Sequence, residues 1–468
     1  MPVNSFDNYP MSWRPVLNNA TVPLYVAIAD MLEKDIKEGI LTPGTKLPPQ
    51  RELADYLDVN LSTISRAFKL CEQKGFISAR VGSGTFVSSD AGFNTILLPN
   101  QGYPHVIEMG SVFPGNSPNH EITAILKKMI AQPDVGRLFQ YGSPEGALWH
   151  KEAAVKLIEK AGYKADPQMI LFTNGAQNAI TAILAGLFKA GDRIGTDLMT
   201  YPGIKTAANM LGIQLVPIKQ KDYEITEEGL MYACKNENIK GLYMVPDFQN
   251  PTTHTMSVST RKMIGEIAIK ENLIVIEDAI HSLLTERPLA PIASYAPDQV
   301  LYISSLSKVI SPGLRIGYIA APEPFKRKLA IALYNFNISV APLMTELVTQ
   351  MINTGVTDKI LDNHRSFTKE QNSIVDQWLG DYQIVGSAAS IFRWLLLPDY
   401  FTGESFELRA YQAGVQVYAA DRFVVGTAQP QNAVRIAVTA PGNDGGLEQG
   451  LRIIKALLES NEEIPSLY

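Results

Sequence analysis

Leu301-Tyr-Ile-Ser-Ser-Leu-Ser-Lys-Val-Ile-Ser-Pro-Gly-Leu-Arg-Ile-Gly-Tyr318 is the stretch that decides the fold, because it places one lysine, Lys308, between an apolar strand and a Ser/Gly-rich turn. A lysine that is partly desolvated at the mouth of a sheet can lose its proton and condense with an aldehyde, which an arginine cannot do. The hydroxyls of Ser305 and Ser307 and the charge of Arg315 are suited to hold a phosphate nearby. The stretch therefore predicts a lysine that reacts with a phosphorylated aldehyde.

Apolar, strand-like runs alternate with helical stretches from Ile107 onward. The runs lie at 169–172, 241–245, 273–276 and 300–303, and clear helical stretches lie at 179–187 and 259–270. Such alternation predicts an α/β fold with a mostly parallel sheet covered by helices, and a site at the carboxyl ends of the strands. Lys308 follows the last of these runs and is expected at that edge.

Three further motifs at predicted strand ends carry groups that suit a phosphorylated ring. The turn 173–179 contains Ala176 and Gln177 at a helix start, where free N–H groups favour a phosphate, although by itself it would be an ordinary loop. Tyr201 offers an aromatic face for stacking, but a lone tyrosine more often belongs to the core. Asp278 follows a buried strand, where a carboxylate is costly unless it meets a positive partner such as a protonated pyridine nitrogen.

The pattern Ser-x-Ser-Lys-x-x-x-Pro-Gly-x-Arg-x-Gly at 305–317 resembles the pyridoxal-phosphate (PLP) lysine motif of fold-type I aminotransferases. The resemblance implies a large PLP-binding domain with a small C-terminal α+β domain, and Lys308 and Asp278 as catalytic residues. It implies that the cofactor is bound by Lys308, Asp278, Asn250, Tyr201, Ala176, Gln177, Ser305, Ser307, Arg315, His281 and Tyr141. Tyr141 would reach the cofactor phosphate, often that of the partner subunit. Arg435 would pair with a substrate carboxylate, whereas its ordinary alternative is a surface arginine of a short strand.

Two positions depart from the pattern of these aminotransferases. Thr253 replaces the usual glycine of an Asn-Pro-x-Gly turn in which Asn250 would donate to the 3′-oxygen of the cofactor. His281 replaces the tyrosine that commonly follows the aspartate, so that a neutral imidazole would have to donate in its place.

The first part of the chain predicts three helices and a hairpin. Leu24, Ile28, Leu32 and Ile36 recur every fourth residue, and two further helices are expected at about 50–57 and 62–74. In the third helix, Ile64, Ala67, Phe68 and Cys71 form an apolar stripe that leaves a short polar and basic face on the other side. The alternation at 76–81 and 85–87, around Gly82 to Gly84, predicts a two-stranded wing.

This arrangement suits a helix that reads DNA, although a small helical domain with an ordinary solvated face has the same periodicity. From Lys46 to Arg80, six cationic residues stand against four acidic ones, which gives this stretch a local charge of about +2. The ordered set Pro-Gly-x-x-Leu-Pro-x-x-Arg-x-Leu-Ala, Ser-Thr-x-x-Arg-Ala and Gly-x-Gly-Thr-Phe-Val closely resembles the winged helix-turn-helix of GntR-type regulators. The resemblance implies that DNA is contacted by Arg51, Ser62, Thr63, Arg66 and Gly84.

Composition is that of a globular protein without a global attraction to nucleic acid. The 468 residues carry a net charge of -6, so DNA binding would have to come from a local patch. Two cysteines are too few and too scattered for a disulfide framework or a metal site. With no apolar leader region or membrane-span candidate, a cytoplasmic location is expected. The expected divisions are an N-terminal extension (1–20), a winged helix-turn-helix domain (21–88), a linker (89–105) and a PLP-binding domain (106–468).

A GntR-like winged helix followed by an aminotransferase-like domain resembles the MocR family of regulators. The resemblance implies a PLP-bound homodimer, usually head-to-tail, that binds operator DNA and responds to an amine, an amino acid or a B6 vitamer. The alternative is an active PLP-dependent aminotransferase with an accessory DNA-binding domain, because the residues that transamination needs are present. The sequence leaves open the effector, the operator and the sign of regulation.

Overall fold

The computed structural model describes residues 11–16, 22–38, 40–41, 45–73, 76–80, 84–87, 106–114, 119–142, 145–426, 428–440 and 445–460. The expected linker at 89–105 lies outside the described residues. Most of the expected N-terminal extension does so too.

The N-terminal part is a three-helix unit with a two-stranded wing. Its elements are α1 (Leu24–Lys37), α2 (Gln50–Leu57), α3 (Leu61–Gln73), β1 (Ile77–Arg80) and β2 (Gly84–Val87). The predicted apolar stripe of α3 is buried along its whole length. Trp13 lies in the same hydrophobic cluster, and its indole Nε1 donates to Asp35 Oδ2 at 2.8 Å. The chain ahead of α1 therefore contributes to this core.

The centre of the molecule is a seven-stranded sheet in the order β4-β12-β11-β10-β9-β5-β6. The strands are β4 (Ile170–Thr173), β12 (Gly317–Ala320), β11 (Val300–Ser305), β10 (Ile274–Asp278), β9 (Gly241–Met244), β5 (Arg193–Thr196) and β6 (Gln214–Pro217). Only β12 runs against its neighbours; the register pairs the others in parallel. The predicted mostly parallel α/β sheet is confirmed.

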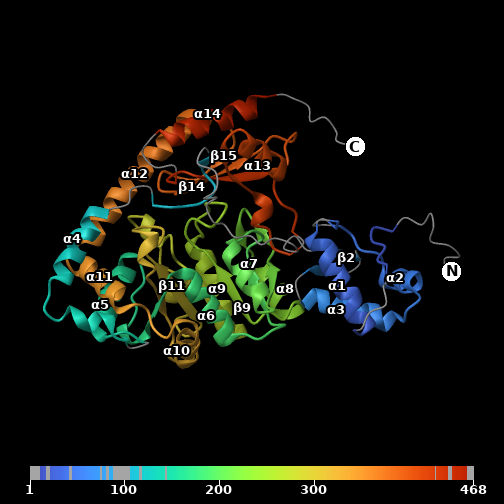
Figure 1. Cartoon of the computed structure of the whole chain (residues 1–468), viewed down its shortest axis with the longest axis horizontal. Helices are drawn as coiled ribbons and strands as arrows, with labels where there is room; N and C mark the ends of the chain where they lie inside the picture. The colour runs from blue at the N-terminus through green and yellow to red at the C-terminus, as the bar shows by residue number, and fades with distance from the viewer. Residues whose placement is uncertain are drawn as a thin grey trace.

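Helices cover both faces of this sheet (Figure 1). The helices of this part are α4 (Asn119–Ile130), α5 (Leu148–Lys160), α6 (Ala176–Leu187), α7 (Pro202–Met210), α8 (Glu227–Asn236), α9 (Val258–Glu271), α10 (Glu323–Asn337) and α11 (Pro342–Asn353), and α4 packs against α11. Along β11, Val300 and Tyr302 belong to one core cluster, and Leu301 and Ile303 to the other. Because side chains alternate across a strand and both faces are covered, the strands read as unbroken apolar runs.

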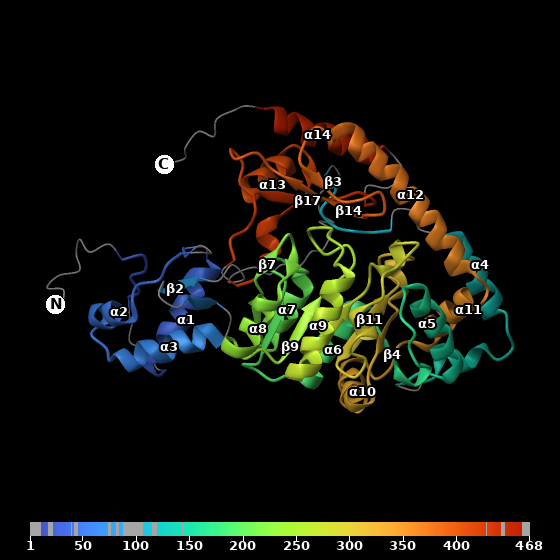
Figure 2. The same cartoon turned by 180° about the vertical axis from the view of Figure 1, so that it is seen from behind.

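The C-terminal part forms a second, smaller layer. The 24-residue helix α12 (Val356–Leu379) runs from the large sheet to it, as Figures 1 and 2 show. The elements of this smaller layer are β13 (Ile384–Val385), β14 (Phe392–Leu396), α13 (Gly403–Gln412), β15 (Val415–Gln416), β16 (Tyr418–Ala419), β17 (Ala433–Ala437) and α14 (Gly446–Glu459). Strand β3 (Ile107–Glu108) pairs in parallel with β15, so the chain enters this small domain before it builds the large one.

A polar contact between described residues joins the winged unit to the large sheet: Gln214 Nε2, on the edge strand β6, donates to the carbonyl of Glu72 at 3.1 Å. Among the helices of the described part, none is long and apolar enough to cross a membrane.

Candidate functional site

Lys308 lies where the sequence predicts it, just beyond the carboxyl end of β11. Its Nζ donates to the carbonyl of Val112 at 2.8 Å. Burial, together with the nearby charges of Arg435 and Arg315, lowers the pKa of Lys308 to about 8 against the opposing effect of Asp278. Lys308 therefore loses its proton far more readily than an ordinary lysine, as a nucleophile requires.

Asp278 ends β10 next to Lys308 and is fully buried. Its Oδ2 accepts a hydrogen bond from the hydroxyl of Tyr243 at 2.6 Å, whereas its Oδ1 has no partner among the described residues. Burial raises the pKa of Asp278 to about 6, while the bond from Tyr243 lowers it. A buried oxygen without a donor is suited to a cationic ring nitrogen, so this site fits a protonated pyridine. Tyr243 was not predicted.

The phosphate candidates gather at the start of α6. Gly175 has φ +84, and a Cβ placed on it would lie 2.7 Å from Nη2 of Arg315. Arg315 donates to the carbonyl of Asn174 at 2.8 Å and to Oγ of Ser307 at 3.3 Å, and Ser305 Oγ donates to Ser307 Oγ at 3.3 Å. The first N–H groups of α6, at Ala176 and Gln177, open on the same turn. This cradle of hydroxyls, N–H groups and one guanidinium fits a phosphate.

Arg435, in β17, reaches the site from the small domain. It is buried, its Nη1 donates to Oδ1 of Asn250 at 2.6 Å, and its Nη2 donates to the carbonyl of Gly110 at 2.5 Å. Its Nε has no partner in the described part of the chain. Burial lowers the pKa of Arg435 to about 10, which leaves it charged. Arg435 is thus no surface arginine, and its oxygen partner on Asn250 leaves the amide nitrogen of Asn250 for another acceptor.

Tyr201 sits at the start of α7 in the same site. Burial raises the pKa of its hydroxyl to about 12, with a further contribution from the nearby charge of Asp278. A Cβ on Gly203 would meet both Oε1 of Gln177 and the ring of Tyr201 at 2.2 Å, which places these two side chains together. Tyr201 therefore lies beside Gln177, close enough to Asp278 and Arg315 for both charges to act on its hydroxyl.

The two positions that depart from the aminotransferase pattern behave differently. Thr253 adopts φ 64, and its N–H donates to the carbonyl of Gln249 at 2.7 Å, so the turn forms without glycine. His281 is buried, with Nδ1 at 3.1 Å from the carbonyl of Phe248, and burial lowers its pKa to about 4. Because a carbonyl only accepts, Nδ1 carries the proton and Nε2 of the neutral ring is an acceptor rather than the expected donor.

One prediction concerns an exposed residue at the rim of the structure. Tyr141 is 85% exposed in the single subunit, and no hydrogen bond among the described residues joins it to the site. Gly110 and Val112 were not predicted, because they act through backbone carbonyls that every residue possesses.

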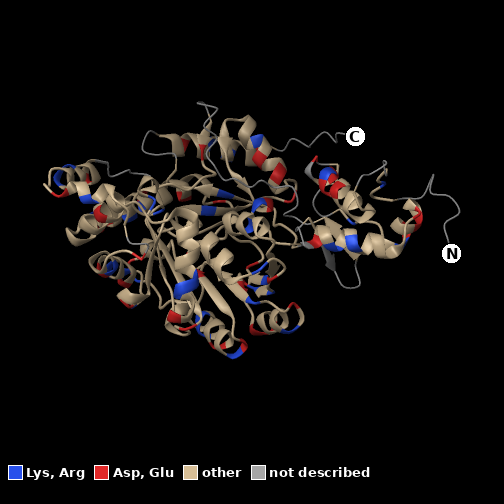
Figure 3. Ribbon diagram, turned by 60° about the horizontal axis from the view of Figure 1, so that its bottom comes forward, with Lys and Arg blue, Asp and Glu red and all other residues tan. Residues whose placement is uncertain are grey.

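The predicted DNA-contacting residues lie on one helix, the helix before it and the wing. Ser62, Arg66, Arg51 and Gly84 are exposed, and Thr63 is half-buried. The guanidinium of Arg66 stacks over the ring of Tyr25, 4.0 Å from its centroid. In Figure 3, basic and acidic residues are mixed over this unit. The polar face of α3 is therefore free to meet a ligand but is not a strongly charged surface.

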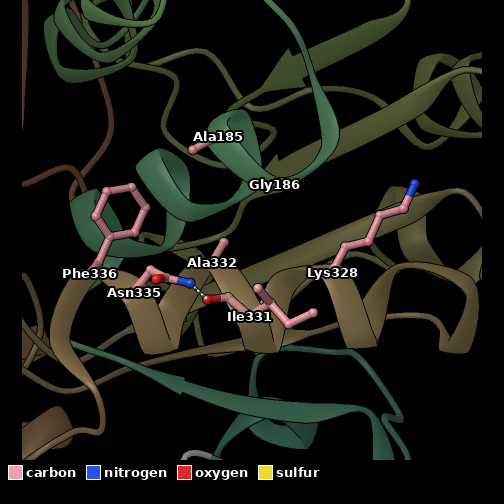
Figure 4. Close-up of a pocket in the computed structure, with 7 residues that line it drawn as sticks. All are labelled: Ala185, Gly186, Lys328, Ile331, Ala332, Asn335 and Phe336. Carbon is pink, nitrogen blue, oxygen red and sulfur yellow. Dashed lines mark hydrogen bonds between the residues drawn. The ribbon is translucent and has the colours of Figure 1, made fainter.

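A separate surface groove of about 390 Å³ lies between α6 and α10, lined by Ala185, Gly186, Lys328, Ile331, Ala332, Asn335 and Phe336 (Figure 4). It adjoins the far end of α6, roughly 14 Å along the helix from Ala176 at 1.5 Å per residue. This groove takes no part in the site of Lys308.

Comparisons with known proteins cover nearly the whole chain. Residues 104–454 match the sequence profile described as aminotransferase class I and II, and residues 24–87 match that of bacterial regulatory proteins, gntR family. YdeF of Bacillus subtilis, named as an uncharacterized HTH-type transcriptional regulator, is 52% identical and covers 98% of this chain and 99% of its own. PdxR of Corynebacterium glutamicum, named as an HTH-type pyridoxine biosynthesis transcriptional regulator, is 25% identical and covers 76% and 78%.

Solved structures resemble the part after the wing. An archaeal alanine:glyoxylate aminotransferase superposes with a TM-score of 0.70 at 22% identity, covering 76% of this chain and 91% of its own. The kynurenine aminotransferase of Pyrococcus horikoshii gives a TM-score of 0.68 at 24% identity, covering 76% and 90%. At these identities the likeness establishes the fold, which is that of fold-type I aminotransferases.

Proposed function

This chain belongs to the MocR-type regulators, in which a GntR-family winged helix precedes an aminotransferase class I and II domain, and on this premise we propose that it binds PLP and DNA and regulates transcription. Its aminotransferase-like domain senses an amine, an amino acid or a B6 vitamer. The chain works as a homodimer, with a head-to-tail arrangement in which Tyr141 reaches the partner's cofactor phosphate.

One observation supports the cofactor half above all others: the free oxygen of Asp278, the depressed pKa of Lys308 and the cradle around Arg315 converge on one site. PLP supplies an aldehyde for an amine and an electron-withdrawing ring. In this proposal Lys308 forms the covalent link, Asp278 holds the proton on the ring nitrogen, and Tyr201 stacks on the ring. The start of α6, Ser305, Ser307 and Arg315 hold the phosphate.

The remaining groups of the site would bind the ring's 3′-oxygen and the ligand's carboxylate. Asn250 keeps its amide nitrogen for the 3′-oxygen of the ring, because its own oxygen is taken by Arg435. Arg435 binds the carboxylate of a ligand, since a buried guanidinium with a free Nε favours a planar anion. His281 supports the turn at Phe248 rather than the cofactor.

The DNA half rests on the exposed face of α3. Substituting Arg51 or Arg66 by alanine should weaken binding to DNA from the chain's own upstream region by about 5- to 150-fold, the equivalent of roughly 1–3 kcal/mol per lost contact. Gel shifts at two salt concentrations measure this, because a lost phosphate contact also flattens the salt dependence.

Lys34→Ala is the matched control, since it removes one exposed positive charge from α1 of the same unit. It should leave binding nearly unchanged. Arg66→Lys separates charge from the stacking on Tyr25, and thermal unfolding checks that each variant is folded. Unchanged binding in both the Arg51 and Arg66 variants would rule out this face as the DNA reader.

The second candidate is an active aminotransferase with an accessory DNA-binding unit. The observation in its favour is that Lys308, Asp278 and Arg435 all face one site, so that Lys308 could also carry the proton between substrate and cofactor. Many turnovers with an amino donor and a keto acceptor favour this candidate. A reaction that stops after one equivalent favours the sensor.

A further inference from the structure

Residues 107–113, which we call the strap, cross the site. Together with Val106 and Pro114, they are the first residues after the wing that the structure describes. Their first half is fixed to the small domain. The N–H groups of Ile107 and Met109 donate to the carbonyls of Gly414 and Gln416 at 2.8 and 2.9 Å, and the carbonyl of Met109 accepts from Ala437 at 2.6 Å. Met109 is fully buried, so the strap moves with the small sheet.

The middle of the strap is held in a tight, specified turn. Oε1 of Glu108 accepts from the N–H groups of Gly110 and Ser111 at 2.8 and 2.7 Å. Oγ of Ser111 is 3.1 Å from the hydroxyl of Tyr418. A Cβ on Gly110 would lie 2.7 Å from the ring of Tyr418, so no other residue fits there without displacing that ring. This turn fixes the direction of the carbonyls that follow.

Those carbonyls meet the two cationic side chains of the site. Gly110 accepts from Nη2 of Arg435 at 2.5 Å, and Val112 accepts from Nζ of Lys308 at 2.8 Å. Arg435 belongs to the small domain and Lys308 to the large one. Through two carbonyls that are two residues apart, the strap therefore joins Arg435, which is proposed to bind a ligand's carboxylate, to Lys308, which is proposed to carry the cofactor.

We propose that the strap reads the ligand directly: a carboxylate bound at Arg435 displaces the carbonyl of Gly110, and the carbonyl of Val112 receives the amine of Lys308 when a ligand's amine takes its place on the cofactor. This inference rests on the proposed function. It adds Glu108, Ser111 and Tyr418 as positioning residues of the site.

The geometry of Arg435 makes the exchange specific. In a guanidinium the Nε and Nη2 N–H bonds point the same way, which is the edge that binds a carboxylate through two parallel hydrogen bonds. Nε is without a partner in the described residues, and Nη2 holds only the neutral carbonyl of Gly110. A carboxylate replaces the carbonyl of Gly110 at this edge of the guanidinium, because a charge-assisted hydrogen bond is stronger than one to a neutral carbonyl. The bond from Nη1 to Asn250 is kept.

The consequence reaches the DNA-binding unit through the chain itself. Displacement of Gly110 loosens the turn that Glu108 holds, and residues 88–106 connect this turn to β2. A ligand with a carboxylate and one without it should therefore differ in their effect on the strap, although both release Lys308.

The test compares two carbonyl-reactive probes on the full-length, PLP-loaded protein: aminooxyacetate, which bears a carboxylate, and methoxyamine, which does not. In each reaction the probe's nitrogen forms a bond to the aldehyde carbon of the cofactor, the bond to Lys308 breaks, and Lys308 leaves as the free amine. Amide hydrogen exchange of the peptide spanning 107–113 is the readout. We expect about ten-fold faster exchange at Gly110 and Ser111 with aminooxyacetate than with methoxyamine.

Two variants sharpen the comparison. Arg435→Leu removes the carboxylate clamp, and the two probes should then give the same exchange. Arg393→Leu removes another buried arginine of the same small sheet, one that pairs with Asp376 and not with the strap, and the difference between the probes should persist. If either variant is unfolded, the wild-type comparison decides alone.

The visible spectrum separates the two ways to fail. A protein whose spectrum shows no bound cofactor, or none that responds to either probe, overturns the proposed function, and this inference with it. A spectrum that responds to both probes while exchange in the strap is the same for both overturns this inference alone.

Discussion

Lys308 shows how the surroundings of one side chain change what it can do. Burial disfavours its charged form, Arg435 and Arg315 disfavour it further, and Asp278 works in the opposite direction. With the resulting pKa of about 8, a large fraction of the molecules carry Lys308 as a neutral amine at mildly alkaline pH. An ordinary lysine becomes neutral only at a much higher pH.

The rate at which the cofactor-free protein captures PLP should therefore rise with pH and level off above a midpoint near 8, because only neutral Lys308 attacks the aldehyde. Arg435→Leu removes the positive neighbour that lowers the pKa of Lys308 more strongly than Arg315 does, so the midpoint should move to higher pH. Borohydride trapping at each pH, followed by peptide mapping, measures this. Label on another lysine, or a midpoint that stays near that of an ordinary lysine, would contradict it.

Residue type and position were enough to predict some of the site but not all of it. Asp278 was predicted because a carboxylate directly after an apolar strand is costly without a partner. Tyr243 was not predicted, because it lies inside the apolar run of β9 like an ordinary core aromatic. Only the structure reveals that its hydroxyl donates to Asp278. Gly110 and Val112 act through their backbones, so no side-chain pattern announces them.

At the scale of elements, the turn after β9 illustrates a fold that tolerates local strain. Gln249 holds it: its Nε2 donates to the carbonyl of Met199 at 2.6 Å, and its Oε1 accepts from the N–H and the hydroxyl of Thr252 at 3.1 and 2.6 Å. These bonds keep Thr253 at φ 64, which a β-branched side chain rarely adopts. The hydroxyl of Thr253 is buried with no partner in the described residues, which adds to the cost.

Thr253→Gly should therefore stabilise the large domain by about 1 kcal/mol, since relief of the left-handed conformation outweighs the added flexibility of glycine. Urea unfolding measures the change in the free energy of unfolding. Asn272→Gly is the control, because Asn272 has φ 52 at the end of α9 but asparagine tolerates that conformation; its change should be about 0.5 kcal/mol or less. Destabilisation by Thr253→Gly would contradict this and would show that the side chain of Thr253 stabilises the turn.

Elements with a strong period were predicted well, and elements with polar buried positions were not. The helix expected at about 62–74 is found at Leu61–Gln73, because its buried stripe is wholly apolar. Helix α12 buries His364, Gln371 and Asn372 among its apolar residues. These polar residues interrupt the apolar periodicity from which the helix could have been predicted. Its role as the connection between the two domains is a property of tertiary packing.

For the whole molecule, the order of the domains follows from sequence, but their connection does not. Patterns of a few residues reveal local elements, whereas the contact between Ser111 and Tyr418 joins positions 307 residues apart. The strap thus brings into the site the described segment that follows the wing in the chain, and we propose that ligand binding acts on the winged unit through it. A regulator requires such a link, and an enzyme with a passenger domain does not.

A ligand shifts the equilibrium between two arrangements only if it binds one of them more tightly. We therefore expect aminooxyacetate to change the affinity for DNA from the chain's own upstream region by about 5- to 150-fold, a coupling of roughly 1–3 kcal/mol, and methoxyamine to change it much less. By reciprocity, that DNA must change the affinity for aminooxyacetate by the same factor. Titration of the cofactor spectrum with and without DNA measures this, with Lys308→Ala as the control that cannot link covalently to PLP. Equal affinity in both conditions, together with steady transamination regardless of DNA, would replace the sensor by the aminotransferase, because the site would then do chemistry without informing the winged helix.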